Sequence, residues 1–258
     1  SEANRCLQCI KPACKGGCPV SVQIPEFIKS LREGDMPGAV RALKEKNSLP
    51  AVCGRVCPQE QQCEKTCVLA RQGAPVAIGR LERYVADWAL RHSGDTPAVS
   101  SLSSAGKRVA VVGAGPAGLA TAYHLRLMGY GVTIFEALPK GGGMAAVGIP
   151  DYRRPPEILE RDLSGMRKMG VEFKPDTSVG EDISSGDITK MYDAVFIATG
   201  AHESRKLDIP GEDSRGVIHG VDFLRKYALG QETGLGRNVV IVGGGNTAID
   251  AARTAVRL

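Results

Sequence analysis

Apolar positions in the first third of the chain recur every three or four residues, which is the spacing of an amphipathic helix. Residues 24–35 carry such a face, and Pro25 stands where a helix often begins. Residues 37–47 resume the pattern, and residues 75–92 predict a longer helix. The apolar stripe of this longer helix consists of Ile78, Leu81, Val85, Trp88 and Ala89. A helical domain is therefore expected over residues 1–91.

From residue 107 the pattern changes to short apolar runs that alternate with helical segments. The runs occupy residues 108–113, 131–136, 193–200 and 238–245. This alternation predicts a parallel sheet with helices on its faces. Residues 92–106, rich in Ser, Gly and Pro, predict a linker. The expected fold class is α+β and multi-domain: an all-α domain, then a doubly wound, Rossmann-like α/β domain and the start of a second one.

Composition supports this class. Aromatic residues make up only 5% of the 258 residues and glycine is frequent, which is typical of α/β nucleotide-binding folds. The net charge of +5 is spread without long runs, so it indicates an ordinary solvated surface or a basic face for a phosphate or acidic partner. No nucleic-acid motif, signal peptide or membrane-spanning stretch is predicted, and a cytoplasmic location is expected.

The first glycine-rich turn follows the run at residues 108–113 and opens a helix. Gly113 allows the tight turn, Gly115 allows backbone to approach a pyrophosphate, and Gly118 allows the helix to pack on the strand. The phosphates would lie at the positive helix N-terminus. Glu136 ends the second strand, where its carboxylate can accept hydrogen bonds from ribose hydroxyls. The turn therefore predicts dinucleotide binding, with a purely structural turn as the alternative.

The second glycine-rich turn repeats this arrangement with Gly243, Gly245 and Ala248. It predicts a second dinucleotide site, again with a structural turn as the alternative. Only ten residues follow Ala248, whereas the second strand of such a unit lies roughly 20 residues further on. We therefore expect the second nucleotide domain to be truncated in this chain.

All eight cysteines lie within the first 67 residues, in two groups of four. The first group has the spacing C-x2-C-x4-C-x3-C-P, which is close to the ferredoxin run. The second group, C-x3-C-P-x4-C-x3-C, can supply the remaining ligands. Zinc and disulfides are the alternatives, but only one pair has CxxC spacing, and a cytoplasmic protein disfavours disulfides. The pattern predicts two [4Fe–4S] clusters.

Glu82 lies on the edge of the apolar stripe formed by residues 78–89. A carboxylate in that position needs a partner. The pattern allows two interpretations, a salt bridge at the edge of the surface or a cluster ligand.

The chain resembles the small (β) subunit of NADPH-dependent glutamate synthase and its relatives. These include the large subunit of the bifurcating NADH-dependent ferredoxin:NADP oxidoreductase and the amino-terminal part of dihydropyrimidine dehydrogenase. The resemblance covers essentially the whole chain. It rests on the stretches CPV with IPEFI, NSLPAVCGRVCP, CEKTCV, AIGRLERYVADW, GAGPAGLA, GGGMAAVGIPDYR, YDAVFIATGA and GGGNTAIDAAR.

The resemblance implies FAD at the first glycine turn, NADP(H) at the second, and two [4Fe–4S] clusters in the helical domain. Carried over by position, one cluster would be held by Cys6, Cys9, Cys14 and Cys67. The other would be held by Cys18, Cys57, Cys63 and Glu82, since the group places a Gln or Glu there. Cys53 would then be a thiol near the cluster without iron, and either Cys53 or Glu82 is the eighth ligand.

The resemblance also implies which other residues contact the nucleotides. Those expected around FAD are Gly113, Gly115, Pro116, Ala117, Gly118, Glu136, Gly142, Gly143, Met144, Gly148, Ile149, Pro150, Arg153, Val179, Ala198, Thr199 and Gly200. Those expected at the second turn are Gly243, Gly245, Asn246 and Thr247. The implied FAD domain covers residues 107–236 and lacks its carboxy-terminal segment. Residues 237–258 would be the first β-α unit of the NAD(P) domain.

The expected function is electron transfer from NADPH through FAD and the clusters to a larger flavin or iron–sulfur partner subunit, as in glutamate synthase. No residue is expected to act as nucleophile or general base, because the cofactors carry the chemistry. One alternative is the bifurcating or pyrimidine-reducing relatives. Another is an electron-transfer module that does not itself oxidise nicotinamide, and the truncated chain alone is expected to react weakly with NADPH.

Overall fold

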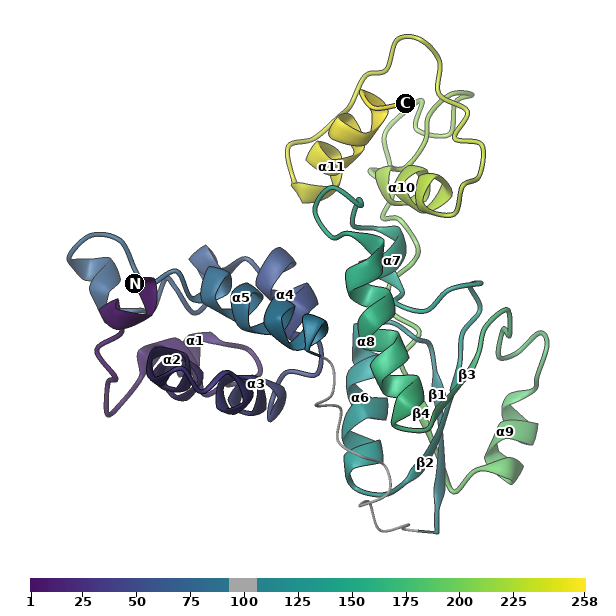
Figure 1. Cartoon of the computed structure of the whole chain (residues 1–258). Helices are drawn as coiled ribbons and strands as arrows, with labels where there is room; N and C mark the ends of the chain where they lie inside the picture. The colour runs from purple at the N-terminus through teal and green to yellow at the C-terminus, as the bar shows by residue number, and fades with distance from the viewer. Residues whose placement is uncertain (93–105) are drawn as a thin grey trace. The chain divides into compact units, whose positions relative to one another are not determined.

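The computed structural model describes residues 1–92 and 106–258 (Figure 1). Most of the predicted linker therefore lies outside the described residues. The chain divides into two compact units. Unit 1 comprises Ser1–Gly106, Ala122–Gly131 and Glu157–Val171, and unit 2 comprises Lys107–Thr121, Val132–Pro156 and Glu172–Leu258. The four-part division expected from the sequence stays a prediction.

Unit 1 begins with the predicted helices. The α-helices of this region are α1 (Ala13–Gly17), α2 (Ile24–Glu33), α3 (Met36–Lys44), α4 (Pro50–Val56) and α5 (Ile78–Arg91). It also contains the short 3-10 helices η1 (Glu2–Arg5), η2 (Gln59–Gln61) and η3 (Val68–Arg71). Gly34 ends α2 in the left-handed region with φ +80°, and Asp35 caps α3 by accepting a hydrogen bond from Gly38 N at 2.9 Å. Phe27, Ile28 and Val85 are fully buried in the core. Apolar spacing thus predicted α2, α3 and α5 correctly, whereas α1 and α4 had no such signal.

Helices α4 and α5 pack closely, backbone against backbone. A Cβ added to Gly54 would lie 2.7 Å from the backbone nitrogen of Arg83, which is closer than side chains tolerate. Glycine at this position therefore lets the two helices approach, and it brings Cys53 of α4 and Cys57 at its C-cap toward Glu82 of α5.

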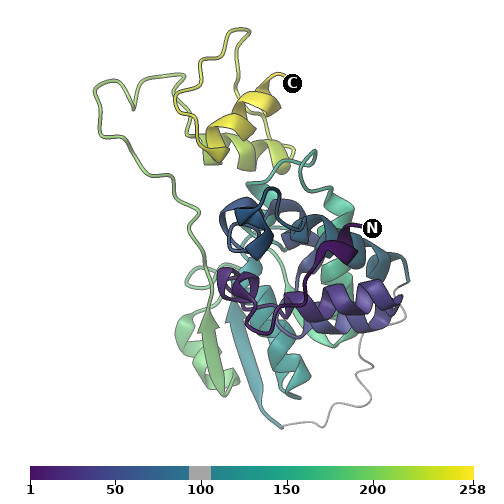
Figure 2. The ribbon, with the colours of Figure 1, turned by 90° about the vertical axis from the view of Figure 1, so that its left-hand side faces the viewer.

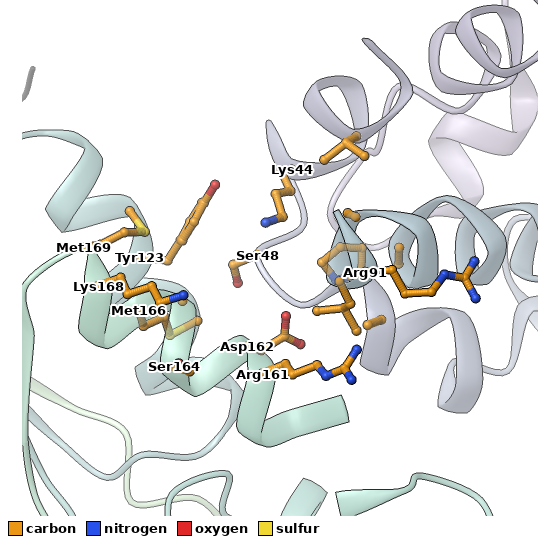
Figure 3. A pocket seen from close by; sticks show the side chains of 17 residues that line it. Lys44, Ser48, Arg91, Tyr123, Arg161, Asp162, Ser164, Met166, Lys168 and Met169 are labelled. Atoms are coloured by element: carbon orange, nitrogen blue, oxygen red, sulfur yellow. The ribbon is translucent and has the colours of Figure 1, made fainter. Parts of the chain in front are cut away.

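Unit 1 also contains the C-terminal half of α6 (Pro116–Leu127) and most of α8 (Pro156–Lys168). Arg126 joins these segments by donating from Nε to the carbonyl oxygen of Met169 at 2.7 Å. A pocket of about 460 Å³ lies within this unit, and Lys44, Ser48 and Asp162 point into it (Figure 3).

Unit 2 is built on the predicted parallel sheet. Four strands, β1 (Arg108–Val112), β2 (Gly131–Phe135), β3 (Val171–Lys174) and β4 (Ala194–Ile197), lie in the order β3-β2-β1-β4. β1 and β4 are parallel, with Val109 beside Ala194. Helix α9 (Ser185–Met191) precedes β4, and Ile188 of this helix joins Phe135 and Tyr192 in the core. The α/β class with an N-terminal helical region is confirmed.

Unit 2 also contains α7 (Met144–Val147), which follows β2, and α10 (Gly220–Ala228) and α11 (Asn246–Ala255), which follow β4. Figure 2 shows the long coil that leaves β4 and leads to α10.

The strand predicted at residues 238–245 is wrong, because this segment has no strand in the structure. Its apolar side chains are exposed, Val240 at 88% and Val242 at 79%. A strand needs a neighbour to pair its backbone N–H and C=O groups, and none of the four strands in the described residues lies beside it. The helix expected after it does form, as α11.

Candidate functional site

One cavity in unit 1 is lined by four cysteines, Cys6, Cys9, Cys14 and Cys67. The rest of its wall is mainly apolar and includes Ile24, Ile28, Val76 and Ile78. These four thiols are the set expected for one cluster. Sulfur ligands in an apolar shell suit an iron–sulfur cluster, because the shell excludes water.

Three contacts hold the segments around this cavity together. Arg5 donates from Nη1 to the carbonyl oxygen of Pro75 at 2.9 Å, and Ala77 N donates to Glu2 Oε1 at 2.9 Å. Thr66 Oγ1 donates to the carbonyl oxygen of Ala13 at 3.1 Å, which joins α1 to the chain just before η3. Burial raises the pKa of the Cys14 thiol to about 11, so an anionic sulfur here requires a compensating positive charge such as iron.

A second group forms around Glu82 in the first turns of α5. Glu82 is only 8% exposed, and its Oε1 accepts a hydrogen bond from Asn47 Nδ2 at 2.8 Å. Burial raises the pKa of Glu82 to about 8, and the neighbouring Cys57 adds to this shift. The surface salt bridge that the sequence left open for Glu82 is therefore wrong.

Cys63 and Cys53 also interact electrostatically with Glu82. Burial raises the pKa of Cys63 to about 12, and the charges of Glu64, Glu82 and Cys18 contribute. A hydrogen bond from Cys53 lowers the pKa of Cys57, which makes Cys57 the more readily ionised thiol of that pair. Glu82 thus interacts electrostatically with Cys57 and with Cys63.

The exact ligand sets stay predictions. Within residues 1–92 and 106–258, no three His, Cys, Asp or Glu side chains converge closely enough to hold a single metal ion. All eight cysteines are free thiols.

The first glycine turn is formed by close backbone approaches in unit 2. Gly113 has φ +104°, and a Cβ there would lie 2.4 Å from the carbonyl oxygen of Ala198. A Cβ on Gly143 would lie 2.7 Å from Gly115 Cα. The turn after β1, the turn at residues 142–143 and the end of β4 therefore meet, which brings together residues that the sequence predicted around one nucleotide.

Glu136 lies beside this turn at the end of β2 and is 7% exposed. Its Oε2 accepts from Ala114 N at 2.7 Å, and its Oε1 accepts from Leu138 N at 2.9 Å. Each oxygen retains a lone pair. The backbone thus holds the carboxylate in place, and its oxygens can still accept hydrogen bonds from ribose hydroxyls.

Other predicted nucleotide residues have different surroundings. Arg153 forms an ion pair of 2.6 Å with Asp250 of α11, and Val179 packs against the core cluster around Phe135. The second turn lies exposed at the surface, with Gly243 at φ +116° and Gly245 at the N-cap of α11. Met144, Gly148 and Pro150 lie in and after α7. The glycines at positions 113–118 and 142–143 are thus the best-assembled part of the nucleotide site.

Sequence reasoning missed Asn47 and Asp250. Both are buried polar residues, 7% and 5% exposed, that contact predicted site residues. Asn47 stands just before the helix start at Pro50, but neither residue type signals its tertiary partner.

Two family models match the chain. The model described as dihydropyrimidine dehydrogenase domain II, 4Fe-4S cluster, matches residues 1–94. The model described as pyridine nucleotide-disulphide oxidoreductase matches residues 107–258. These matches confirm the predicted iron–sulfur, flavin and pyridine-nucleotide cofactors over the zinc and disulfide alternatives.

Several known proteins are similar to this chain. The NADPH-Fe(3+) oxidoreductase subunit beta of Geobacter sulfurreducens is 44% identical over 100% of this chain and 38% of its own length. The glutamate synthase [NADPH] small chain of Escherichia coli is 40% identical over 100% of this chain and 57% of its own length. The resemblance to the glutamate synthase small-subunit group is confirmed, although the chain spans only about 40 to 60% of these relatives.

A solved structure resembles part of the chain. FprA of Mycobacterium tuberculosis in complex with NADPH matches with a TM-score of 0.51 and 31% identity, over 57% of this chain and 36% of its own. In the described residues, no helix combines the length and apolar character needed to cross a membrane. Because a family model matches more than half of the residues, the chain belongs to the pyridine nucleotide-disulphide oxidoreductase family.

Proposed function

We propose that this chain is the electron-transferring part of an NADPH-oxidising subunit of the glutamate synthase type. It would carry electrons through FAD and two [4Fe–4S] clusters to a larger partner subunit. The single observation that carries the proposal is the cavity lined by Cys6, Cys9, Cys14 and Cys67 in the same chain as the assembled first glycine turn.

The bound cofactors supply the redox chemistry, because flavin exchanges electrons in pairs with nicotinamide and singly with clusters. The protein's own residues would bind and orient the cofactors and shield them from water. The glycine turn presents backbone N–H groups and the N-terminus of α6 to a pyrophosphate. Glu136 holds the ribose, and the apolar wall around the first cavity excludes water from the sulfur ligands.

We assign the ligands of the two clusters as follows. Cys6, Cys9, Cys14 and Cys67 hold the first, which is supported by their common cavity. Cys18, Cys57, Cys63 and Glu82 hold the second, which is supported by the burial of Glu82 and its electrostatic interaction with Cys57 and Cys63. Cys53 remains a thiol without iron.

The partner is proposed from the names of the relatives. Several are subunits of larger oxidoreductases, including the glutamate synthase small chain and the beta subunit of the NADP(+)-dependent formate dehydrogenase of Moorella thermoacetica. A shared NADPH, flavin and cluster unit would deliver electrons to different acceptors in these enzymes. We place the protein in the cytoplasm, where eight free thiols are stable.

A second candidate function is an electron-transfer module that does not oxidise nicotinamide itself. The exposed second turn and the absence of a strand at residues 238–242 in the described structure favour this for the isolated chain. In the intact protein we propose that NADPH reduces the flavin.

The test is anaerobic purification of the intact protein, followed by assays of iron, acid-labile sulfide, zinc and flavin and by titration with NADPH. We expect about eight iron and eight sulfide per chain, as two four-iron clusters require, and bleaching of the flavin by NADPH. Zinc without sulfide would contradict the relay. Clusters and flavin without bleaching would favour the electron-transfer module.

A further inference from the structure

Asn47 lies between α3 and α4 and is 7% exposed. Its side-chain amide takes part in three hydrogen bonds. Nδ2 donates to Glu82 Oε1 at 2.8 Å, and Oδ1 accepts from Leu49 N at 3.0 Å. Oδ1 also accepts from Cys53 Sγ at 3.5 Å. The two residues left open as the eighth ligand, Cys53 and Glu82, thus both contact one amide group.

The orientation of this amide is fixed by backbone. Leu49 N–H is a donor, so it must face the amide oxygen and not the NH2 group. The backbone N–H of Asn47 in turn donates to the carbonyl oxygen of Leu43 at 3.0 Å, which anchors the residue to the end of α3. The NH2 group is therefore directed at Glu82.

This orientation distinguishes the two candidate ligands. The amide N–H attracts a carboxylate, and by binding Oε1 of Glu82 it leaves Oε2 for a metal. The amide oxygen faces Cys53, where it would repel the negative sulfur of a metal-bound thiolate. A neutral donor also orients the carboxylate without cancelling its charge, as an Arg or Lys would.

We propose that Asn47 is the positioning residue of the second cluster, which turns one oxygen of Glu82 toward iron and keeps Cys53 from replacing it. This inference rests on the proposed function, because it requires a cluster held by Cys18, Cys57, Cys63 and Glu82. It goes further in naming the residue that decides the eighth ligand.

The test compares Asn47→Asp, Glu82→Gln and the double variant in the intact, anaerobically purified protein. Asn47→Asp keeps an acceptor for Leu49 N–H but loses the donor to Glu82. We expect iron to fall from about eight to about four per chain, with the electron paramagnetic resonance signal of the first cluster unchanged. In the double variant the amide introduced by Glu82→Gln can donate to the new carboxylate, so the second cluster should return.

The matched control is Ser48→Ala, a neighbouring residue that is equally buried at 7%. It should keep both clusters and the reduction potential of each. If Asn47→Asp also keeps both clusters at unchanged potentials, or if the double variant is not rescued, the positioning role is overturned. A wild-type protein without iron or sulfide would overturn the proposed function itself, whereas a Glu82→Ala variant with both clusters intact would overturn the role of Glu82 and the positioning role of Asn47 but leave the proposed function standing.

Discussion

Arg153 Nη1 and Asp250 Oδ2 lie 2.6 Å apart and join the chain after α7 to α11 within unit 2. Tyr152 lies beside this pair, and its hydroxyl is 3.3 Å from Asp250 Oδ1. The guanidinium groups of Arg253 and Arg257 each lie 4.4 Å from the centre of the Tyr152 ring. This ion pair links the segment after α7 to the helix that follows the second glycine turn, and the flavin contact expected for Arg153 stays a prediction.

Replacing Asp250 by Asn should therefore destabilise unit 2. Asp250 is only 5% exposed, and Arg153 would lose its partner in a partly buried site. We expect a loss of about 2 kcal/mol in the free energy of unfolding, measured by chemical denaturation. Glu160→Gln is the control, because its ion pair with Arg167 is exposed and should contribute less than about 1 kcal/mol. Equal effects of the two variants would contradict a linking role for Asp250.

Gly113→Ala should prevent correct formation of the first nucleotide turn. The residue has φ +104°, and the added Cβ would lie 2.4 Å from the carbonyl oxygen of Ala198. We expect a destabilisation of at least about 2 kcal/mol and loss of bound flavin, measured by thermal unfolding and by the visible spectrum.

Gly165→Ala is the matched control for that substitution. This glycine lies within α8, and nothing is found within 4 Å of its added Cβ. The change should stabilise the helix by about 0.5 to 1 kcal/mol and leave flavin binding unchanged. A similar loss of flavin in both variants would show that close approach at residue 113 is not the cause.

Glu136→Ala should weaken flavin binding. It removes the acceptor for the backbone N–H groups of Ala114 and Leu138 and the proposed partner of the ribose. Loss of one such hydrogen bond to bound flavin costs at least about 1.4 kcal/mol, which is tenfold in affinity. Flavin retained on gel filtration and the dissociation constant for added FAD measure the effect. Full affinity in this variant would exclude Glu136 from the site.

Cys14→Ser and Cys53→Ser should differ in iron content. Cys14 lines the four-cysteine cavity, whereas Cys53 is hydrogen-bonded to Asn47 and is not proposed as a ligand. We expect the Cys14 variant to lose about four iron atoms per chain and the Cys53 variant to retain about eight. Loss of a cluster in the Cys53 variant would reverse the assignment of the eighth ligand, and a full iron content in the Cys14 variant would contradict the first cluster's ligand set.

Asp162 should make the stability of unit 1 depend on pH. Burial raises its pKa to about 7, against the opposing charges of Lys44 and Arg55, and its Oδ2 has no hydrogen-bond partner among the described residues. Because the folded-state pKa lies above that of the unfolded chain, stability falls as pH rises from about 4 to about 7.

Asp162→Asn removes this effect. The variant should be more stable than the wild type at pH 8, by about 4 kcal/mol at most, and the difference should shrink toward pH 4. Denaturation across this pH range measures it. A difference that does not change with pH would show that Asp162 does not titrate on unfolding.

The sequence by itself determined three helices of the first 91 residues, α2, α3 and α5, three of the predicted strands, and the presence of cluster and nucleotide motifs. Apolar spacing, glycine at fixed offsets and cysteine spacing are local signals, so each is readable from neighbouring positions. The run at residues 238–245 had the same local signal as β1, yet it forms no strand, because a strand depends on pairing with a neighbour that local sequence does not supply.

Only the tertiary structure decided the partners of individual polar side chains. Glu82 has the sequence position of a surface-edge residue, but packing of α4 against α5 buries it and brings it to Asn47, 35 positions away. The fold also pairs Arg153 with Asp250, 97 positions away, a partner that no local pattern indicates. A buried charge takes whichever partner the packed chain brings within hydrogen-bonding distance, and that choice depends on the fold as a whole.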